Sequence, residues 1–192
     1  MNPLESAVTH VSPTAWIKLI FFAALLFCCV GQTSPAFAKT SGEVEIGETL
    51  REVTLRGLNS PARKLSAFRG KPLIINVWAS WCGPCRQEMA SLERLAWRDP
   101  KAPFTIIGVS TDDYPEPAKA LLQRTNATIT HFIDHQLEVE NMLGASKLPL
   151  TVLVDANGRV LHKIYGAQEW DGPAALKLIG DAFGYSMTTP KR

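Results

Sequence analysis

The sequence lacks the features of a nucleic-acid-binding, repetitive or nucleotide-binding protein. Its 20 lysines and arginines nearly balance its 18 aspartates and glutamates, and the basic residues are scattered along the chain. Nucleic-acid-binding proteins gather basic side chains on one face, so this distribution argues against that class. The sequence contains no internal repeat, low-complexity tract, phosphate loop, catalytic triad or dinucleotide fingerprint. Its 192 residues are 46% hydrophobic and 20% charged, which predicts one globular domain.

Long hydrophobic runs are also missing, apart from one near the amino terminus. Lys18 precedes an apolar run at residues 19–30, which is followed by Pro35 and by the small-x-small sequence at residues 36–38. Twelve helical residues rise only about 18 Å, short of the roughly 30 Å hydrocarbon core of a membrane. We therefore predict that residues 1–38 are a signal peptide cleaved before Lys39, the alternative being an uncleaved membrane anchor.

Cysteine is scarce, and cleavage would make it scarcer. Two of the four cysteines, Cys28 and Cys29, lie in the predicted signal peptide, so the exported protein keeps only Cys82 and Cys85. A single pair three residues apart is no structural disulfide framework. The mature chain would still be long enough to bury a core without such staples.

The rest of the chain predicts an α/β domain at residues 49–184. A polar, flexible arm is expected at residues 39–48, an N-terminal β-hairpin at residues 52–68 and a disordered tail at residues 185–192. Continuous apolar runs typical of strands covered on both faces occur at residues 72–78 and 104–109. Strands at residues 150–154 and 159–165 are joined by a turn sequence. Helices are expected at residues 86–98, 116–124, 137–143 and 173–183, the last capped by Asp171.

The pattern Cys-x-x-Cys at the start of a helix favours redox chemistry. N–H groups of the first turn and the helix dipole stabilise a thiolate at Cys82, so its pKa should fall below that of a free cysteine. Cys85 lies about one turn further on and can attack a mixed disulfide formed at Cys82. The alternatives are a zinc half-site, for which a second ligand pair is missing, and an inert structural disulfide.

Two segments carry a family resemblance. The first reads Trp78-Ala79-Ser80-Trp81-Cys82-Gly83-Pro84-Cys85-Arg86-Gln87-Glu88-Met89, and the second reads Leu148-Pro149-Leu150-Thr151-Val152-Leu153-Val154-Asp155-Ala156-Asn157-Gly158. Together they resemble the thioredoxin superfamily, in detail its TlpA/ResA-like extracytoplasmic branch. The resemblance covers roughly residues 49–180 and implies a thioredoxin-like fold, with a central mixed β-sheet flanked by helices.

The resemblance also implies roles for individual residues. Pro149 matches the family's cis-proline, which leaves the backbone of Leu148 free to pair with a substrate; the alternative is an ordinary loop proline before a strand. Trp81 would flank the nucleophile as a partly exposed platform, the alternative being packing in the core. Thioredoxin has a buried Asp where this chain has Asn76, which cannot accept a proton. The TlpA/ResA-like branch instead places a Glu at the position of Glu88, which could relay a proton for Cys85. The alternative for Glu88 is a solvated charge of the first helical turn.

Other polar residues carry no recognisable pattern. Trp78 is expected in the core, and His131, His135 and His162 are expected on the surface or hydrogen-bonded. Asp112 and Asp134 look like turn and loop residues. No metal site is predicted.

The sequence therefore predicts a periplasmic or otherwise extracytoplasmic thiol-disulfide oxidoreductase, membrane-anchored if uncleaved. Its only redox group would be the Cys82–Cys85 pair. The Gly-Pro dipeptide resembles that of cytoplasmic thioredoxin and favours a reductase, recharged by an inner-membrane electron donor. The resemblance implies clients such as apocytochrome c or copper-assembly proteins, and a monomer is expected. The alternatives are a thiolate copper chaperone, a disulfide-forming oxidant of the same fold, and a thioredoxin-fold peroxidase.

Overall fold

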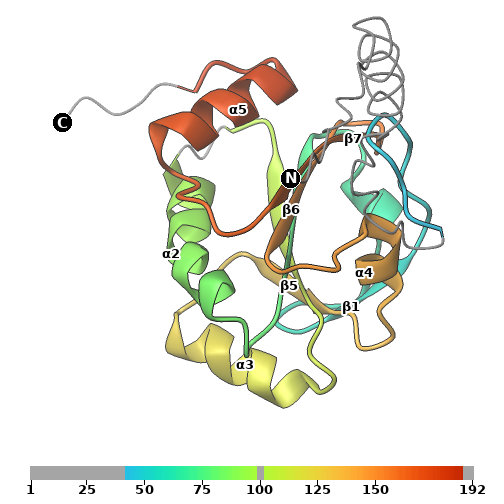
Figure 1. Ribbon diagram of the computed structural model, residues 1–192, viewed down its shortest axis with the longest axis vertical. Helices are drawn as coiled ribbons and strands as arrows, with labels where there is room; N and C mark the ends of the chain where they lie inside the picture. Colours follow the sequence, from blue (N-terminus) through green and yellow to red (C-terminus); the bar gives the residue numbers. More distant parts are fainter. Residues whose placement is uncertain (1–41, 99–101, 188–192) are drawn as a thin grey trace, which may run out of the picture. The chain divides into compact units, whose positions relative to one another are not determined.

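A computed structural model describes residues 42–98 and 102–187, all within one compact unit. The predicted signal peptide at residues 1–38 lies outside the described residues. Figure 1 shows a central sheet with helices on both faces. In chain order the elements are β1 (Thr54–Gly57), β2 (Arg63–Lys64), the 3-10 helix η1 (Leu65–Phe68), β3 (Leu73–Trp78), α2 (Gly83–Arg98), β4 (Thr105–Ser110), α3 (Pro115–Arg124), β5 (Thr130–Ile133), α4 (Glu138–Leu143), β6 (Leu150–Val154), β7 (Val160–Tyr165) and α5 (Pro173–Phe183).

The sheet is mixed and its strands run in the order β2-β1-β5-β4-β3-β6-β7. Strands β3, β4 and β5 are parallel neighbours, whereas β6, β7 and β1 join antiparallel. The fold class predicted from the sequence is therefore confirmed. Where an N-terminal hairpin was expected, β1 and β2 pair antiparallel over two residue pairs only. Residues 65–68, expected to continue the second strand, form η1 instead.

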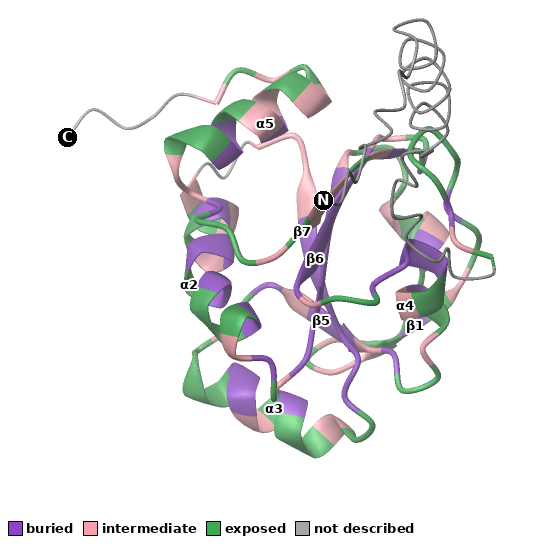
Figure 2. Ribbon diagram, viewed as in Figure 1, coloured by how far each residue is buried: buried purple, intermediate pink, exposed green. Residues whose placement is uncertain are grey.

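Strand β3 is buried along its whole length and divides the core in two. Figure 2 shows its neighbour β6, also buried, between α2 and α4. Successive side chains of a strand point to opposite faces. Ile75 and its odd-numbered neighbours pack in the cluster that contains Val139 of α4, whereas Ile74 packs in the cluster that contains Leu92 of α2. Asn76 and Trp78 share the parity of Ile74. The strand therefore presents a polar side chain to the helix that follows the cysteines.

Strand β5 was not predicted from the sequence. It has only four residues and includes Thr130 and His131, so it lacks the apolar run that revealed β3 and β4. It nevertheless pairs with both β4 and β1 inside the sheet. Pairing with two neighbouring strands stabilises β5, although its own composition does not predict a strand.

The prediction of a flexible arm at residues 39–48 is wrong for its described part. Val44 is only 3% exposed, and its N–H donates to the carbonyl of Met142. Glu43 forms an ion pair with Lys163, a pair largely removed from solvent. Burial of Val44 and this ion pair fix residues 42–48 against α4 and β7. Residues 39–41 lie outside the described residues.

Two expectations at the carboxyl end need similar correction. Asp171 does not cap α5, whose N-cap is Gly172 with no side-chain bond, because its carboxylate accepts hydrogen bonds from Arg94 instead. In the predicted tail, the Tyr185 N–H donates to the carbonyl of Gly180, and Met187 packs against the core. Residues 188–192 lie outside the described residues.

His131 also differs from expectation, whereas His135 and His162 are exposed as predicted. The His131 ring is buried at a near-right angle to the Trp78 ring, and neither ring nitrogen has a hydrogen-bond partner among the described residues. Burial disfavours the charged imidazolium and lowers the pKa of His131 to about 4.

We predict that this histidine makes the oxidised protein acid-sensitive. Below pH 6.5 the unfolded imidazole binds a proton, while the folded one stays neutral down to about pH 4. The unfolded state then holds more protons, so the free energy of unfolding should fall by roughly 3 kcal/mol across this window. Urea unfolding at several pH values should show a shallower fall for His131→Phe. Equal slopes would place the His131 pKa near its ordinary value.

Candidate active site

The two cysteines lie at the junction between β3 and α2. The buried strand ends at Trp78, the Cys82 N–H donates to the carbonyl of Ala79, and the Arg86 N–H donates to the carbonyl of Cys82. Pro84 occupies the first turn of α2, where its missing N–H breaks no helical bond. The strand therefore delivers Cys82 directly to the amino end of the helix.

Cys82 and Cys85 form a disulfide, with an Sγ–Sγ distance of 2.03 Å. Cys82 is 5% exposed and Cys85 is fully buried. The Cys85 N–H points at the Cys82 sulfur, 3.2 Å away. Backbone N–H donors stabilise a negative charge on the sulfur they face, so the geometry favours a thiolate at Cys82 after reduction.

Asp112 anchors the loop that carries the first cysteine. Its carboxylate accepts hydrogen bonds from the Ser80 N–H and hydroxyl, at 2.9 and 2.6 Å, and from the Ser110 hydroxyl at 2.6 Å. The Arg86 guanidinium donates to the carbonyl of Ser80. Asp112 was expected to be only a turn residue, but it follows β4 at the sheet edge where β3 also ends. That shared edge is the sequence signal that could have identified it.

Three further residues predicted from the sequence surround the pair. The peptide bond from Leu148 to Pro149 is cis, and the half-buried Leu148 packs against the cluster that contains both cysteines. Trp81 is 69% exposed beside Cys82, whereas Trp78 is fully buried in the core. An apolar surface thus adjoins the more accessible sulfur.

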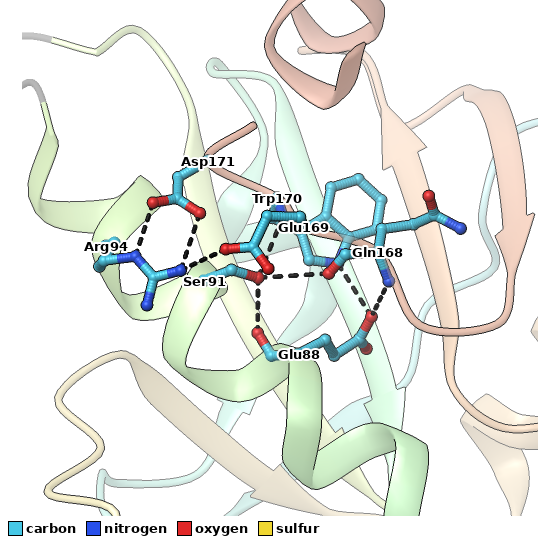
Figure 3. Close-up of polar contacts among 7 residues, drawn as sticks. All are labelled: Glu88, Ser91, Arg94, Gln168, Glu169, Trp170 and Asp171. Atoms are coloured by element: carbon cyan, nitrogen blue, oxygen red, sulfur yellow. Dashed lines mark hydrogen bonds and ion pairs between the residues drawn. The ribbon is translucent and has the colours of Figure 1, made fainter. Parts of the chain in front are cut away.

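Glu88 lies one turn beyond Cys85 on α2 and is only 1% exposed. Its Oε1 accepts a hydrogen bond from Asn76 Nδ2 at 2.7 Å. Its Oε2 accepts hydrogen bonds from the Gln168 N–H at 3.1 Å and from Trp170 Nε1 at 3.0 Å. Figure 3 shows the carboxylate beneath the segment between β7 and α5. Glu88 is therefore not a solvated charge of the first helical turn.

Burial and hydrogen bonding shift the pKa of Glu88 in opposite directions. Removal from water raises the pKa of the Glu88 carboxyl, and the bonds from Trp170, Asn76 and the Gln168 N–H offset only part of that rise. The pKa thus lies above its ordinary value, as a group that exchanges protons near neutral pH requires.

Sequence reasoning missed Trp170 and Gln168. They follow Glu88 by 82 and 80 residues, so no local pattern links them to it. Asn76 was noted only as a residue that cannot accept a proton. The structure shows that the Asn76 amide donates a hydrogen bond to Glu88, the carboxylate that the family resemblance offers in place of thioredoxin's buried Asp.

Metal and membrane features are absent from the part of the chain that the structure describes. Within residues 42–98 and 102–187 no three His, Cys, Asp or Glu side chains gather as a metal site. Nor does any helix in those ranges have the length and hydropathy to cross a membrane.

Comparison with known proteins agrees with this geometry. The Redoxin family matches residues 30–179. The thiol-disulfide oxidoreductase ResA of Geobacillus thermodenitrificans is 32% identical over 143 residues, which are 74% of this chain and 82% of that protein. The thiol:disulfide interchange protein DsbE of Vibrio cholerae is 31% identical over 148 residues, which are 72% and 78% of the two chains.

A solved structure agrees as well. A DsbE-type thiol:disulfide interchange protein from Chlorobium tepidum superposes with a TM-score of 0.67 at 27% identity, covering 73% of this chain and 99% of that one. This similarity confirms the thioredoxin-like fold.

We predict that brief alkylation of the reduced protein labels Cys82 and spares Cys85. Cys82 is the more exposed sulfur and the one faced by a backbone N–H, so it combines access with thiolate character. Peptide mapping by mass spectrometry, with the fully unfolded protein as the control that labels both, measures the ratio. Preferential labelling of Cys85 would contradict the assignment.

Proposed function

The chain belongs to the Redoxin family as a thiol-disulfide oxidoreductase similar to ResA and DsbE, and from this premise we propose that it is an extracytoplasmic reductase of client-protein disulfides. The observation that carries the proposal is the Cys82–Cys85 disulfide at the amino end of α2, with its more accessible sulfur beside the exposed Trp81. The pair itself carries the electrons, and no further cofactor is needed.

Exchange proceeds in two displacements. In the reduced protein the Cys82 thiolate attacks one sulfur of a client disulfide, forming a mixed disulfide and releasing the other client sulfur as a thiolate. Cys85 then loses its proton and attacks the Cys82 sulfur. This step restores the Cys82–Cys85 bond and releases the second client thiolate. Two electrons pass to the client, and the protein leaves oxidised.

Glu88 is the group we assign to the proton of Cys85. It is buried on the same helix one turn away, and its raised pKa suits a carboxylate that accepts a proton from a thiol near neutral pH. Asn76 cannot take that role but holds Oε1 of Glu88. The buried acid of this site is therefore supplied by α2 instead of β3.

Clients dock beside the cis-proline in this proposal. Leu148 and Trp81 flank the pair, so an extended client segment can lie against the backbone of Leu148 while its sulfur reaches Cys82. The family resemblance points to apocytochrome c or copper-assembly proteins as clients and to an inner-membrane electron donor. The protein acts as a monomer outside the cytoplasm, after cleavage at residue 38 or anchored by the uncleaved segment.

Covalent capture tests this function. Cys85→Ser removes the resolving sulfur, so the mixed disulfide at Cys82 should persist and identify the client by mass spectrometry in the native compartment. Cys82→Ser is the matched control and should capture nothing. Insulin reduction by the wild-type protein, lost in both variants, gives the activity. Capture by Cys82→Ser alone would reverse the roles of the two sulfurs.

A second test concerns the proton. We predict that Glu88→Gln slows reduction of a protein disulfide by on the order of a hundredfold, the usual contribution of general base catalysis, and flattens the pH profile. Initial alkylation of Cys82 should be unchanged. Glu169→Gln, which alters an exposed carboxylate paired with Arg94, is the control. Wild-type rates for Glu88→Gln from pH 6 to 9 would remove Glu88 from the mechanism.

A further inference from the structure

The two oxygens of the Glu88 carboxylate have different kinds of partner, of which Figure 3 shows Gln168 and Trp170. Oε2 faces the Gln168 backbone N–H and the Trp170 indole N–H. Oε1 faces the Asn76 amide, whose Nδ2 also donates to Thr151 Oγ1 at 3.0 Å. The surroundings of the carboxylate are therefore asymmetric, although its two oxygens are chemically equivalent in water.

This asymmetry decides which oxygen can carry a proton. Backbone and indole N–H groups only donate, so a proton on Oε2 would face two donors and no acceptor. An unsatisfied buried polar group is strongly unfavourable. The Asn76 side chain contains both a donor and an acceptor, and rotation of its amide would present Oδ1 to a protonated Oε1. Only the Oε1 side can serve both protonation states.

Trp170 is held firmly in its place. Its side chain is fully buried in the cluster that includes Leu95 and Ile179. Its backbone N–H donates to Ser91 Oγ at 3.0 Å, and Ser91 lies on the same helix as Glu88. The helix that carries the carboxylate thus also fixes the residue that donates to it.

We propose that Trp170 is a positioning residue for disulfide exchange: with the Gln168 N–H it fixes Oε2 of Glu88 and leaves Oε1 to take up and release the proton. The proposal rests on the proposed proton role of Glu88 and adds a residue to it. Trp170 is fully buried and packs in a different cluster from the two cysteines, so we expect it to act through Glu88.

The pKa of Glu88 depends on its burial and its hydrogen bonds, and the nearby charged side chains are paired with one another. On α2 and the segment before α5, Arg94 pairs with Glu169 and Asp171 in an exposed network. On the core side, Asn76 of β3 and Thr151 of β6 are uncharged. The oxidised cysteine pair is a disulfide and does not titrate.

The test is the titration of Glu88 in the oxidised protein, followed by the carboxyl ¹³C signal of glutamate-labelled samples and assigned with Glu88→Gln. Trp170→Phe keeps an aromatic ring in the core but removes one donor that stabilises the carboxylate. We expect the Glu88 midpoint to move to higher pH. Trp97→Phe is the matched control. Trp97 lies on α2, like Glu88, but its indole N–H donates to Thr128, so its loss should leave the Glu88 midpoint unchanged. An unchanged midpoint in folded Trp170→Phe overturns the proposal.

A readout on the unmodified chain covers the case in which that variant does not fold. The indole ¹H–¹⁵N signal of Trp170 in the wild-type protein should shift with the Glu88 midpoint, and Glu88→Gln should abolish the shift. An indole signal that ignores the titration overturns the proposal.

The rate of exchange separates the two proposals. If Trp170→Phe moves the Glu88 midpoint and the pH profile of disulfide reduction together, both stand. If it moves the midpoint but leaves the profile at the wild-type position, Trp170 positions Glu88 as proposed and the proton role of Glu88 fails.

Discussion

The burial of one carboxylate organises the active site of this protein. Glu88 is removed from water between α2, β3 and the segment before α5, and three N–H donors from the latter two elements hold it there. An ionised carboxylate in such a place is tolerated only with its hydrogen bonds made. The same bonds connect the helix of the cysteines to the central strand and to a segment 80 residues away, so the proposed proton transfer and the packing depend on the same contacts.

Asp112 is a second buried carboxylate, and it binds the loop that precedes Cys82. Asp112 accepts hydrogen bonds from the Ser80 N–H and hydroxyl and so fixes the loop before Cys82, while Glu88 follows Cys85 on α2. The two carboxylates have different hydrogen-bond partners. Asp112 is bound to the loop backbone and sets its shape, whereas Glu88 has one oxygen facing an amide that can donate or accept.

The sequence predicted those parts of the molecule whose signals are local. The apolar runs of β3 and β4, the cysteine spacing and the Gly and Pro residues gave the central sheet, the strand-to-helix junction and, with the family resemblance, the cis peptide at Pro149. The predictions failed for segments that are stabilised by residues distant in the sequence. Strand β5 is held by its neighbours and Val44 by a carbonyl of α4, and His131 is buried against the Trp78 ring. Glu88 itself was identified, but its partners Trp170 and Gln168 could be found only in three dimensions.

The most direct test of a proton shared between Cys85 and Glu88 is the reduction potential of the Cys82–Cys85 pair from pH 5 to 9, in the wild-type protein and in Glu88→Gln. Reduction places a thiol or thiolate beside Glu88 and should change its pKa, so the two reactions are linked. Each proton taken up with the two electrons adds about 30 mV per pH unit to the slope. If Glu88 exchanges a proton with Cys85, the wild-type curve should show a change of slope that the Glu88→Gln curve lacks. Curves that stay parallel throughout this range would contradict it.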